Sequence, residues 1–251
     1  MDITFEKTPE LFGTFHIVSV LIILLSCIPV YHGLKKCNEA VLLKFLHYSG
    51  LLMIIMEIWK QWFSYVYVYN HVFSMWFFPW QLCSMAMYCS FFIPYFKEKF
   101  QNTLLVFLAT YSLFAAIMAL AVPADMLRPQ ILLTCHGFIY HGIMLYQSIA
   151  AMLVVYRRKN ISFIPATYMF LIMAAIAEII NVVSHHVLQN WKLEPNMFNI
   201  TPYYPSTQFV FHEIALAIGI IPQLIIYLLL IIISAGLLFV WQKNRFTKEK
   251  D

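Results

Sequence analysis

Apolar residues run in long blocks along the whole chain, separated by short polar stretches. A hydrocarbon core about 30 Å thick needs about 20 apolar residues in helical form. The pattern predicts seven spans, which are residues 12–32, 42–66, 76–96, 102–123, 130–156, 164–187 and 209–241. No internal repeat and no low-complexity linker divides them. We therefore expect an all-α polytopic membrane protein, a bundle of seven transmembrane helices forming a single domain over residues 1–251.

The composition agrees with this interpretation. Of the 251 residues, 62% are hydrophobic and 11% are charged, which is about half the charged fraction of a soluble domain. The formal net charge of +4 needs no nucleic-acid partner, because basic residues of membrane proteins collect on cytoplasmic loops. We expect a multi-pass protein of the cell membrane whose partners are membrane lipids. The pattern leaves the oligomeric state open.

The basic residues also predict an orientation. Of the 16 lysines and arginines, most lie beside the ends of the first, third, fifth and seventh spans. The opposite ends hold Lys7, Lys60, Arg128 and Lys192. The positive-inside rule then places the N-terminus outside and the C-terminus in the cytoplasm.

This orientation brings polar residues from several spans into the outer half of the bilayer. At 1.5 Å per residue, Cys83 lies about 10 Å below the outer surface and His136 about 9 Å below it. The same layer receives His16, Glu57, Lys60, Gln81, His141, Glu178, Asn181, His185 and His212. Ionisable groups inside a membrane are costly and commonly functional. We take this layer as the candidate site.

Each of these residues also has a purely structural interpretation. Glu57 and Lys60 are three positions apart and can neutralise each other. A single histidine in a membrane helix more often forms an interhelical hydrogen bond than it catalyses a reaction, and a cysteine is a common packing residue. The hypothesis of a site therefore depends on their shared depth.

A thiol and an imidazole at one depth favour nucleophilic chemistry. Cys83 can attack a carbonyl once a histidine, His136 or His141, takes its proton, and Asn181 or Glu178 can orient the imidazole. Lys60 or Gln81 can donate hydrogen bonds to a developing oxyanion. The substrate class expected for a thiol in a membrane is an acyl ester that enters from the lipid.

Zinc hydrolysis is the competing chemistry, because the chain has nine histidines. However, the sequence contains no His-x-x-x-His and no His-Glu-x-x-His pattern. Ligands from separate helices could still converge on zinc. Our prediction contains no metal and no cofactor.

The outward segment 188–208 combines several prolines with aromatic residues such as Trp191 and Tyr203. Prolines disfavour a helix here, and aromatic side chains suit the headgroup region. The segment could form a lid over an outward cavity or a belt at the membrane interface. The composition favours the belt.

Short motifs at these positions resemble the YwaF family of bacterial integral membrane proteins. The motifs cover nearly the whole chain, and they are His16 at the start of the first span, Glu57-x-x-Lys60, Pro79-Trp80-Gln81-Leu82-Cys83, Cys135-His136-Gly137-Phe138-x-x-His141-Gly142, Asn181 and Tyr204-Pro205.

The resemblance implies a lipid-modifying activity. An animal member of the wider family resembles a phospholipid acyltransferase with an acyl-transferring cysteine and a histidine inside the membrane. More distant androgen-induced relatives are lipid-ester hydrolases that use threonine and histidine. By this resemblance Cys83 matches the acyl-accepting cysteine and His136 matches its histidine. The sequence departs from the family pattern at Trp80 and Gln81, where a second proline and a histidine often stand.

The hypothesis is an intramembrane acyltransferase or lipid-ester hydrolase that acts on a phospholipid or lysophospholipid through Cys83 and His136. The alternative from another class is a transporter or a binder of a small ligand that uses the same polar pocket. The hydropathy pattern shows neither an inverted repeat nor paired broken helices, features that many transporters have.

Overall fold

The computed structural model describes residues 4–123, 125–158, 161–188 and 194–247. Trp191 and Lys192 lie outside this part. Six of the described helices are long and apolar enough to cross a membrane, which confirms an all-α, multi-pass membrane protein. They are α1 (Thr14–Lys35), α2 (Glu39–Phe63, continued by the π-helical turn Ser64–Val68), the pair α4 (Glu98–Phe107) and α5 (Leu113–Ala121) joined by the π-helical turn Leu108–Ser112, α6 (Ile131–Arg157), α7 (Ile164–Leu188) and α9 (Ile220–Thr247).

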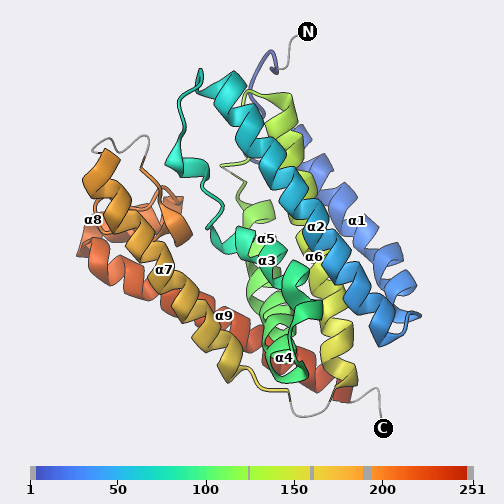
Figure 1. Ribbon diagram of the computed structural model, residues 1–251. Helices are drawn as coiled ribbons and strands as arrows, with labels where there is room; N and C mark the ends of the chain where they lie inside the picture. Colours follow the sequence, from blue (N-terminus) through green and yellow to red (C-terminus); the bar gives the residue numbers. More distant parts are fainter. Residues whose placement is uncertain (1–3, 124, 159–160, 189–193, 248–251) are drawn as a thin grey trace.

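Helix α6 is the centre of the bundle. In Figure 1, α1, α2 and α6 run side by side, α7 and α8 lie on the other side of the molecule, and α9 crosses from α8 to the lower end near α4 and α6. Helix α3 (Met85–Phe92) packs against α2 at Gly50, where an added Cβ would lie 2.5 Å from the backbone nitrogen of Phe91. No side chain fits at that position, so a glycine is what allows the two helices to approach so closely.

The third expected span, residues 76–96, is only partly helical. A 3₁₀ turn, Met75–Phe77, is followed by irregular backbone, and a continuous run of helical turns begins at Leu82 and ends at Tyr95. That run is about 20 Å long, too short to cross a core of about 30 Å alone. Pro79 lies in the irregular part and can neither donate a backbone hydrogen bond nor sit easily inside a helix.

The seventh expected span, residues 209–241, is two helices, α8 (Phe209–Ile218) and α9. They meet at Gly219, whose φ of 93° is a conformation that glycine adopts readily. The ring centroids of Phe211 and Tyr227 are 4.8 Å apart, whereas the same two positions in a straight helix would be about 24 Å apart. Helix α8 therefore folds back along α9.

The segment Glu194–Ser206, which we call the buried segment, leads from α7 towards α8. Most of its residues are buried, and they include the 3₁₀ turn Met197–Asn199. The ring of Phe198 lies 6.0 Å from that of Phe170, near the start of α7. The described part thus folds into the bundle rather than forming the surface belt favoured above.

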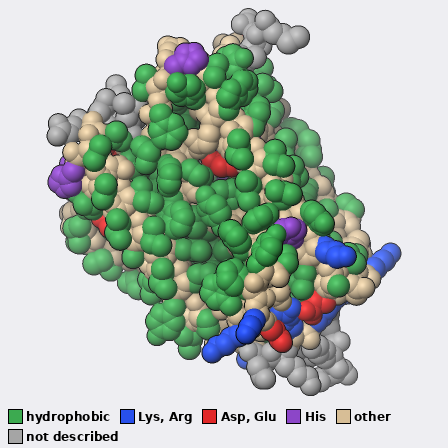
Figure 2. Space-filling view, in the orientation of Figure 1, with side chains coloured by type: hydrophobic (Ala, Val, Ile, Leu, Met, Phe, Trp, Pro, Cys, Tyr) green, Lys and Arg blue, Asp and Glu red, His purple; other side chains and the backbone are tan. Residues whose placement is uncertain are grey.

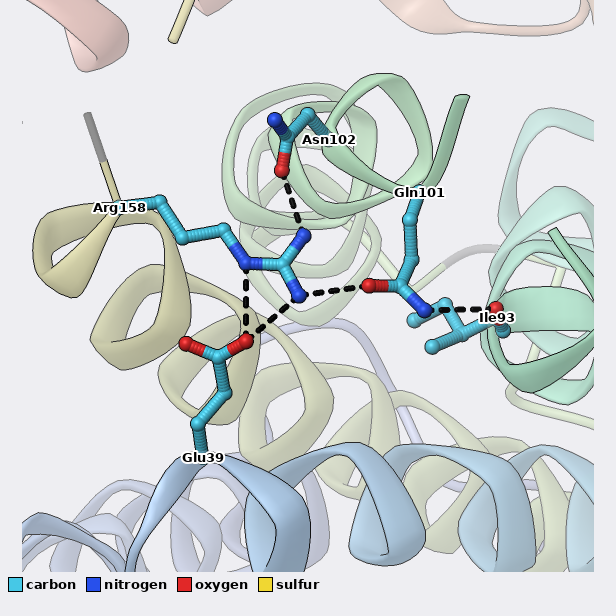
Figure 3. A network of polar contacts seen from close by, with 5 residues as sticks. All are labelled: Glu39, Ile93, Gln101, Asn102 and Arg158. Atoms are coloured by element: carbon cyan, nitrogen blue, oxygen red, sulfur yellow. Dashed lines mark hydrogen bonds and ion pairs between the residues drawn. The ribbon is translucent and has the colours of Figure 1, made fainter. Parts of the chain in front are cut away.

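The helix ends that carry most of the described basic residues lie together at one end of the molecule. Lys and Arg side chains gather at the lower end of Figure 2, the end where Figure 1 places the C-terminus. There the guanidinium of Arg158 hydrogen-bonds Glu39 Oε1 at 2.6 Å and the side-chain oxygens of Gln101 and Asn102 at 2.6 Å each (Figure 3). These four residues, which we call the Arg158 cluster, connect the ends of α2, α4 and α6.

Candidate functional site

Glu57 and Lys60 form a buried ion pair near the end of α2. Lys60 Nζ lies 2.7 Å from Glu57 Oε1, and Gln61 Nε2 donates to the same oxygen at 2.8 Å. Gln61 also donates to the backbone carbonyl of Phe77, which precedes the irregular part of the third span. The carboxylate is thus held by two donors, and Lys60 keeps donors that can act elsewhere.

His136 is oriented by a backbone carbonyl. Its Nε2 lies 3.1 Å from Met56 O, and because a carbonyl can only accept, Nε2 carries the proton. The ring stacks between those of Trp59 and Tyr140, with both pairs of centroids 5.7 Å apart. Nδ1 then carries the lone pair, and it makes no hydrogen bond with any residue that the structure describes. A fixed imidazole with one open basic nitrogen can accept a proton.

His141 repeats this arrangement one turn deeper. Its Nδ1 donates to Gly137 O at 2.7 Å, which leaves the lone pair on Nε2. Within the described residues, that nitrogen also has no hydrogen-bond partner. Lys60 lies within electrostatic range of both His136 and His141.

Cys83 lies in the first turn of the helical run Leu82–Tyr95. Its thiol is within electrostatic range of Lys60 and of two buried tyrosines, Tyr140 on α6 and Tyr227 on α9. Among the described residues neither His136 nor His141 hydrogen-bonds the thiol. The structure brings Cys83 and both imidazoles around Lys60, without direct contact between thiol and imidazole.

Tyr140 is a member of this site that sequence reasoning missed. Its side chain is buried, and its hydroxyl has hydrogen-bond geometry with no described residue, although it lies beside the Ser84 side chain and near Glu57. Tyr140 is four positions after His136 and next to His141, so helical spacing could have found it. We call Glu57, Lys60, Cys83, His136, Tyr140 and His141 the Lys60 cluster.

Gln81 and Asn181 hold the buried segment. The Gln81 amide accepts from Phe198 N at 2.9 Å and donates to Asn196 O at 3.0 Å. The Asn181 amide accepts from Met197 N at 2.7 Å and donates to Met197 O at 3.2 Å. Both amides hydrogen-bond backbone groups of the buried segment that a regular helix would pair within itself. The structure therefore gives Gln81 and Asn181 a positioning role.

Glu178 and His185 lie on the same face of α7 as Asn181, as their spacing predicts. Asn181 Nδ2 donates to Glu178 Oε2 at 3.4 Å, and His185 Nδ1 donates to Glu194 Oε2 at 2.8 Å. Glu194, which sequence reasoning missed, is 3% exposed. This face of α7 thus contacts the buried segment.

The other two histidines of the candidate layer, His16 and His212, also make structural contacts. His212 Nδ1 donates to Ser206 O at 3.0 Å, which ties α8 to the end of the buried segment. His16 Nε2 donates to Leu120 O at 2.8 Å, and its Nδ1 accepts from Phe12 N at 3.0 Å. Both ring nitrogens of His16 are therefore used, and it ties α1 to α5.

Tyr204 anchors the buried segment from within. Its hydroxyl donates to Pro195 O at 3.4 Å. Burial, together with the nearby charge of Glu194, raises the pKa of Tyr204 to about 12. The hydroxyl therefore stays protonated and remains a donor at neutral pH.

A zinc site finds no support in the described residues, where no three histidine, cysteine or acidic side chains come together as metal ligands do. Comparison with known proteins adds no relative, since no family model, no curated protein and no solved structure matches the chain. The likeness to the YwaF family therefore rests on the sequence motifs alone.

Proposed function

We propose that the protein transfers or hydrolyses an acyl chain of a membrane phospholipid, with Cys83 as nucleophile and His136 as base. The observation that carries this proposal is the Lys60 cluster, in which a thiol and two oriented imidazoles with open nitrogens lie around one partly buried lysine. Acyl transfer needs a nucleophile, a base and a cation or hydrogen-bond donor near the developing oxyanion.

The proposal includes the orientation in the cell membrane. Seven segments cross the bilayer, with the short run Leu82–Tyr95 as the third and α9 as the last. The N-terminus is outside and the C-terminus is cytoplasmic. The gathering of basic side chains at one end supports this topology. With the proposed orientation, Cys83 lies in the outer half of the bilayer.

The reaction proceeds in two steps. Cys83 Sγ attacks the ester carbonyl carbon while His136 Nδ1 accepts the thiol proton, and the bond to the lipid oxygen breaks as that proton passes to it. A lysolipid hydroxyl or water then attacks the thioester, the carbon–sulfur bond breaks, and the proton of the attacking group returns to sulfur through His136. Lys60 and the Tyr140 hydroxyl stabilise the oxyanion in both steps.

The imidazole must approach the thiol when substrate binds, since the two are not hydrogen-bonded in this structure. Such contacts commonly tighten only in the complex. A turn of the His136 ring towards the substrate breaks one hydrogen bond, to Met56 O, and shifts the ring against Trp59 and Tyr140.

The test is lipid turnover by the purified protein in nanodiscs that contain a phospholipid with a labelled acyl chain and an unlabelled lysophospholipid. Cys83→Ser and His136→Ala are expected to lose at least 100-fold of the turnover per folded molecule. Cys83→Ser should keep the Tm, whereas His136→Ala should lower it because the ring packs on Trp59 and Tyr140. Cys89→Ala, on the same helical run, is the control that keeps turnover. Full turnover in both site variants would overturn the proposal.

A binding or transport function is the second candidate, and the two interrupted spans favour it. Irregular backbone before Leu82, the break at Gly219 and the buried segment place non-helical chain inside the bundle. In membrane proteins such chain usually lines a ligand site. This function predicts ligand-dependent thermal stabilisation that survives Cys83→Ser, together with no lipid turnover by the unmodified protein.

A further inference from the structure

Gln223, in the first turn of α9, is the most conspicuous polar residue outside the Lys60 cluster. Its side chain is 0% exposed, and both Nε2 and Oε1 are buried without a hydrogen-bond partner in the part of the chain that the structure describes. A buried amide with neither atom paired is destabilising in any protein interior, and more so where no water is available. A group outside the described chain must therefore satisfy it.

Gln223 lies on the covered face of α9, the face that also holds Tyr227, against which Phe211 of α8 packs. Most of α9 is exposed, but Gln223, Tyr227, Ile231 and Ala235 are all buried. They recur every four residues, which places them on one face of the helix. Gln223 and Tyr227 are the polar half of this covered face.

Tyr227 lies one helical turn after Gln223 and is also near the Cys83 thiol. Its side chain lies beside those of Asn199 and Gln208 and within electrostatic range of Cys83. Asn196, in the same buried segment, has a buried Nδ2 that also lacks a partner. Uncharged donors and acceptors thus collect on the α9 side of Cys83, while Lys60 and the imidazoles lie towards α2 and α6.

We propose that Gln223 and Tyr227 form a binding site for a neutral hydroxyl-bearing group, such as the free hydroxyl of a glycerol lipid. One donor and one acceptor on a single amide match a hydroxyl, which accepts one hydrogen bond and donates another. The identification of this group as the acyl acceptor rests on the proposed function, because the site then presents the hydroxyl to the acyl group on Cys83.

The first test is thermal unfolding of the ligand-free protein. Gln223→Leu removes two unpaired polar atoms at similar volume, so its Tm is expected to rise by about 3 °C. Gln242→Leu is the control on the same helix, because Gln242 is also buried and shares an unpaired Oε1, but its Nε2 donates to Ala109 O at 2.7 Å, a bond that the substitution removes. The control is expected to lower the Tm. A lower Tm for Gln223→Leu would mean that the protein itself pairs the amide, which would overturn the proposal.

The second test is binding of 1-monooleoylglycerol, compared with its 2,3-di-O-methyl ether, measured by the shift in Tm. The unmodified protein is expected to bind the hydroxyl form at least tenfold more tightly, about the value of one buried hydrogen bond. Gln223→Leu and Tyr227→Phe should each reduce this preference, and Gln223→Leu should abolish it. Equal binding of both probes by the unmodified protein, or an unchanged preference in Gln223→Leu, would overturn the proposal.

Cys83→Ser separates this inference from the proposed function. The variant is expected to retain the hydroxyl preference, because the thiol takes no part in binding. If the unmodified protein prefers the hydroxyl but turns over no lipid, the binding site stands and the acyl-transfer proposal fails. If turnover depends on Cys83 but Gln223→Leu leaves the preference intact, the acyl-transfer proposal stands and this inference fails.

Discussion

The Arg158 cluster and the Lys60 cluster are both polar and at least partly buried, yet they differ in how completely they are paired. In the Arg158 cluster, Nε and both terminal guanidinium nitrogens donate hydrogen bonds, and Gln101 Nε2 in turn donates to Ile93 O at 3.0 Å (Figure 3). In the Lys60 cluster, the Tyr140 hydroxyl and one nitrogen each of His136 and His141 have no partner among the described residues.

This difference separates a structural cluster from a candidate site. A closed network contributes to the fold through each of its bonds and offers nothing to a ligand. Open donors and acceptors are costly without a ligand, so their retention in a membrane protein points to one. The two clusters therefore predict opposite responses to substitution.

The largest loss of stability is expected from a substitution in the fully paired Arg158 cluster. Arg158→Leu removes the four hydrogen bonds that the guanidinium donates to Glu39, Gln101 and Asn102. At somewhat less than about 1 kcal/mol for each bond in this partly exposed cluster, the free energy of unfolding should fall by about 3 kcal/mol. Turnover per folded molecule should not change. Arg157→Leu is the control, because Arg157 is exposed and donates to the carbonyls of Cys37 and Lys35. Its cost should stay below about 1 kcal/mol, and equal losses in both variants would contradict the distinction.

A smaller loss of stability is expected from substitution of Asn181, whose side-chain amide holds the buried segment. Asn181→Leu leaves the backbone N–H of Met197 unpaired and removes one of the two donors to its carbonyl, the other being Ile200 N, which should cost about 2 kcal/mol in thermal unfolding. Since Gln81 holds the same segment beside Cys83, turnover should also fall. Ser184→Ala, on the same face of α7, serves as the control. A variant as stable as the unmodified protein would show that the segment is not held in this way.

The smallest change in stability is expected within the open cluster. Tyr140→Phe removes a hydroxyl without a partner, so the free energy of unfolding should change by less than about 0.5 kcal/mol. Turnover should fall at least about tenfold, because an oxyanion donor is lost. Tyr146→Phe should show the reverse, since the Tyr146 hydroxyl lies 2.6 Å from Ser26 Oγ on α1. A stability loss in Tyr140→Phe with full turnover would assign Tyr140 to packing.

Hydropathy predicted the fold class because burial in lipid constrains every residue of a crossing helix. It could not locate the interruptions, since Pro79 and Gly219 are single residues within long apolar blocks. The polar layer was predicted from depth, but depth does not show which side chains pair with backbone. In the structure, three residues of that layer hydrogen-bond backbone groups and have no bond to the imidazoles of His136 and His141: Gln81, Asn181 and His16. Gln223 was visible as a polar residue in an apolar block, and only its missing partners give it significance.

The most direct measurement is mass spectrometry of the intact and digested protein after brief incubation in nanodiscs with a phospholipid that carries an isotopically labelled acyl chain. The account predicts the labelled acyl mass on the peptide that contains Cys83, removable by hydroxylamine as a thioester is. The adduct should be absent from Cys89 and from the Cys83→Ser variant. Lipid turnover without an acyl group on Cys83, or the same adduct in the Cys83→Ser variant, would contradict it.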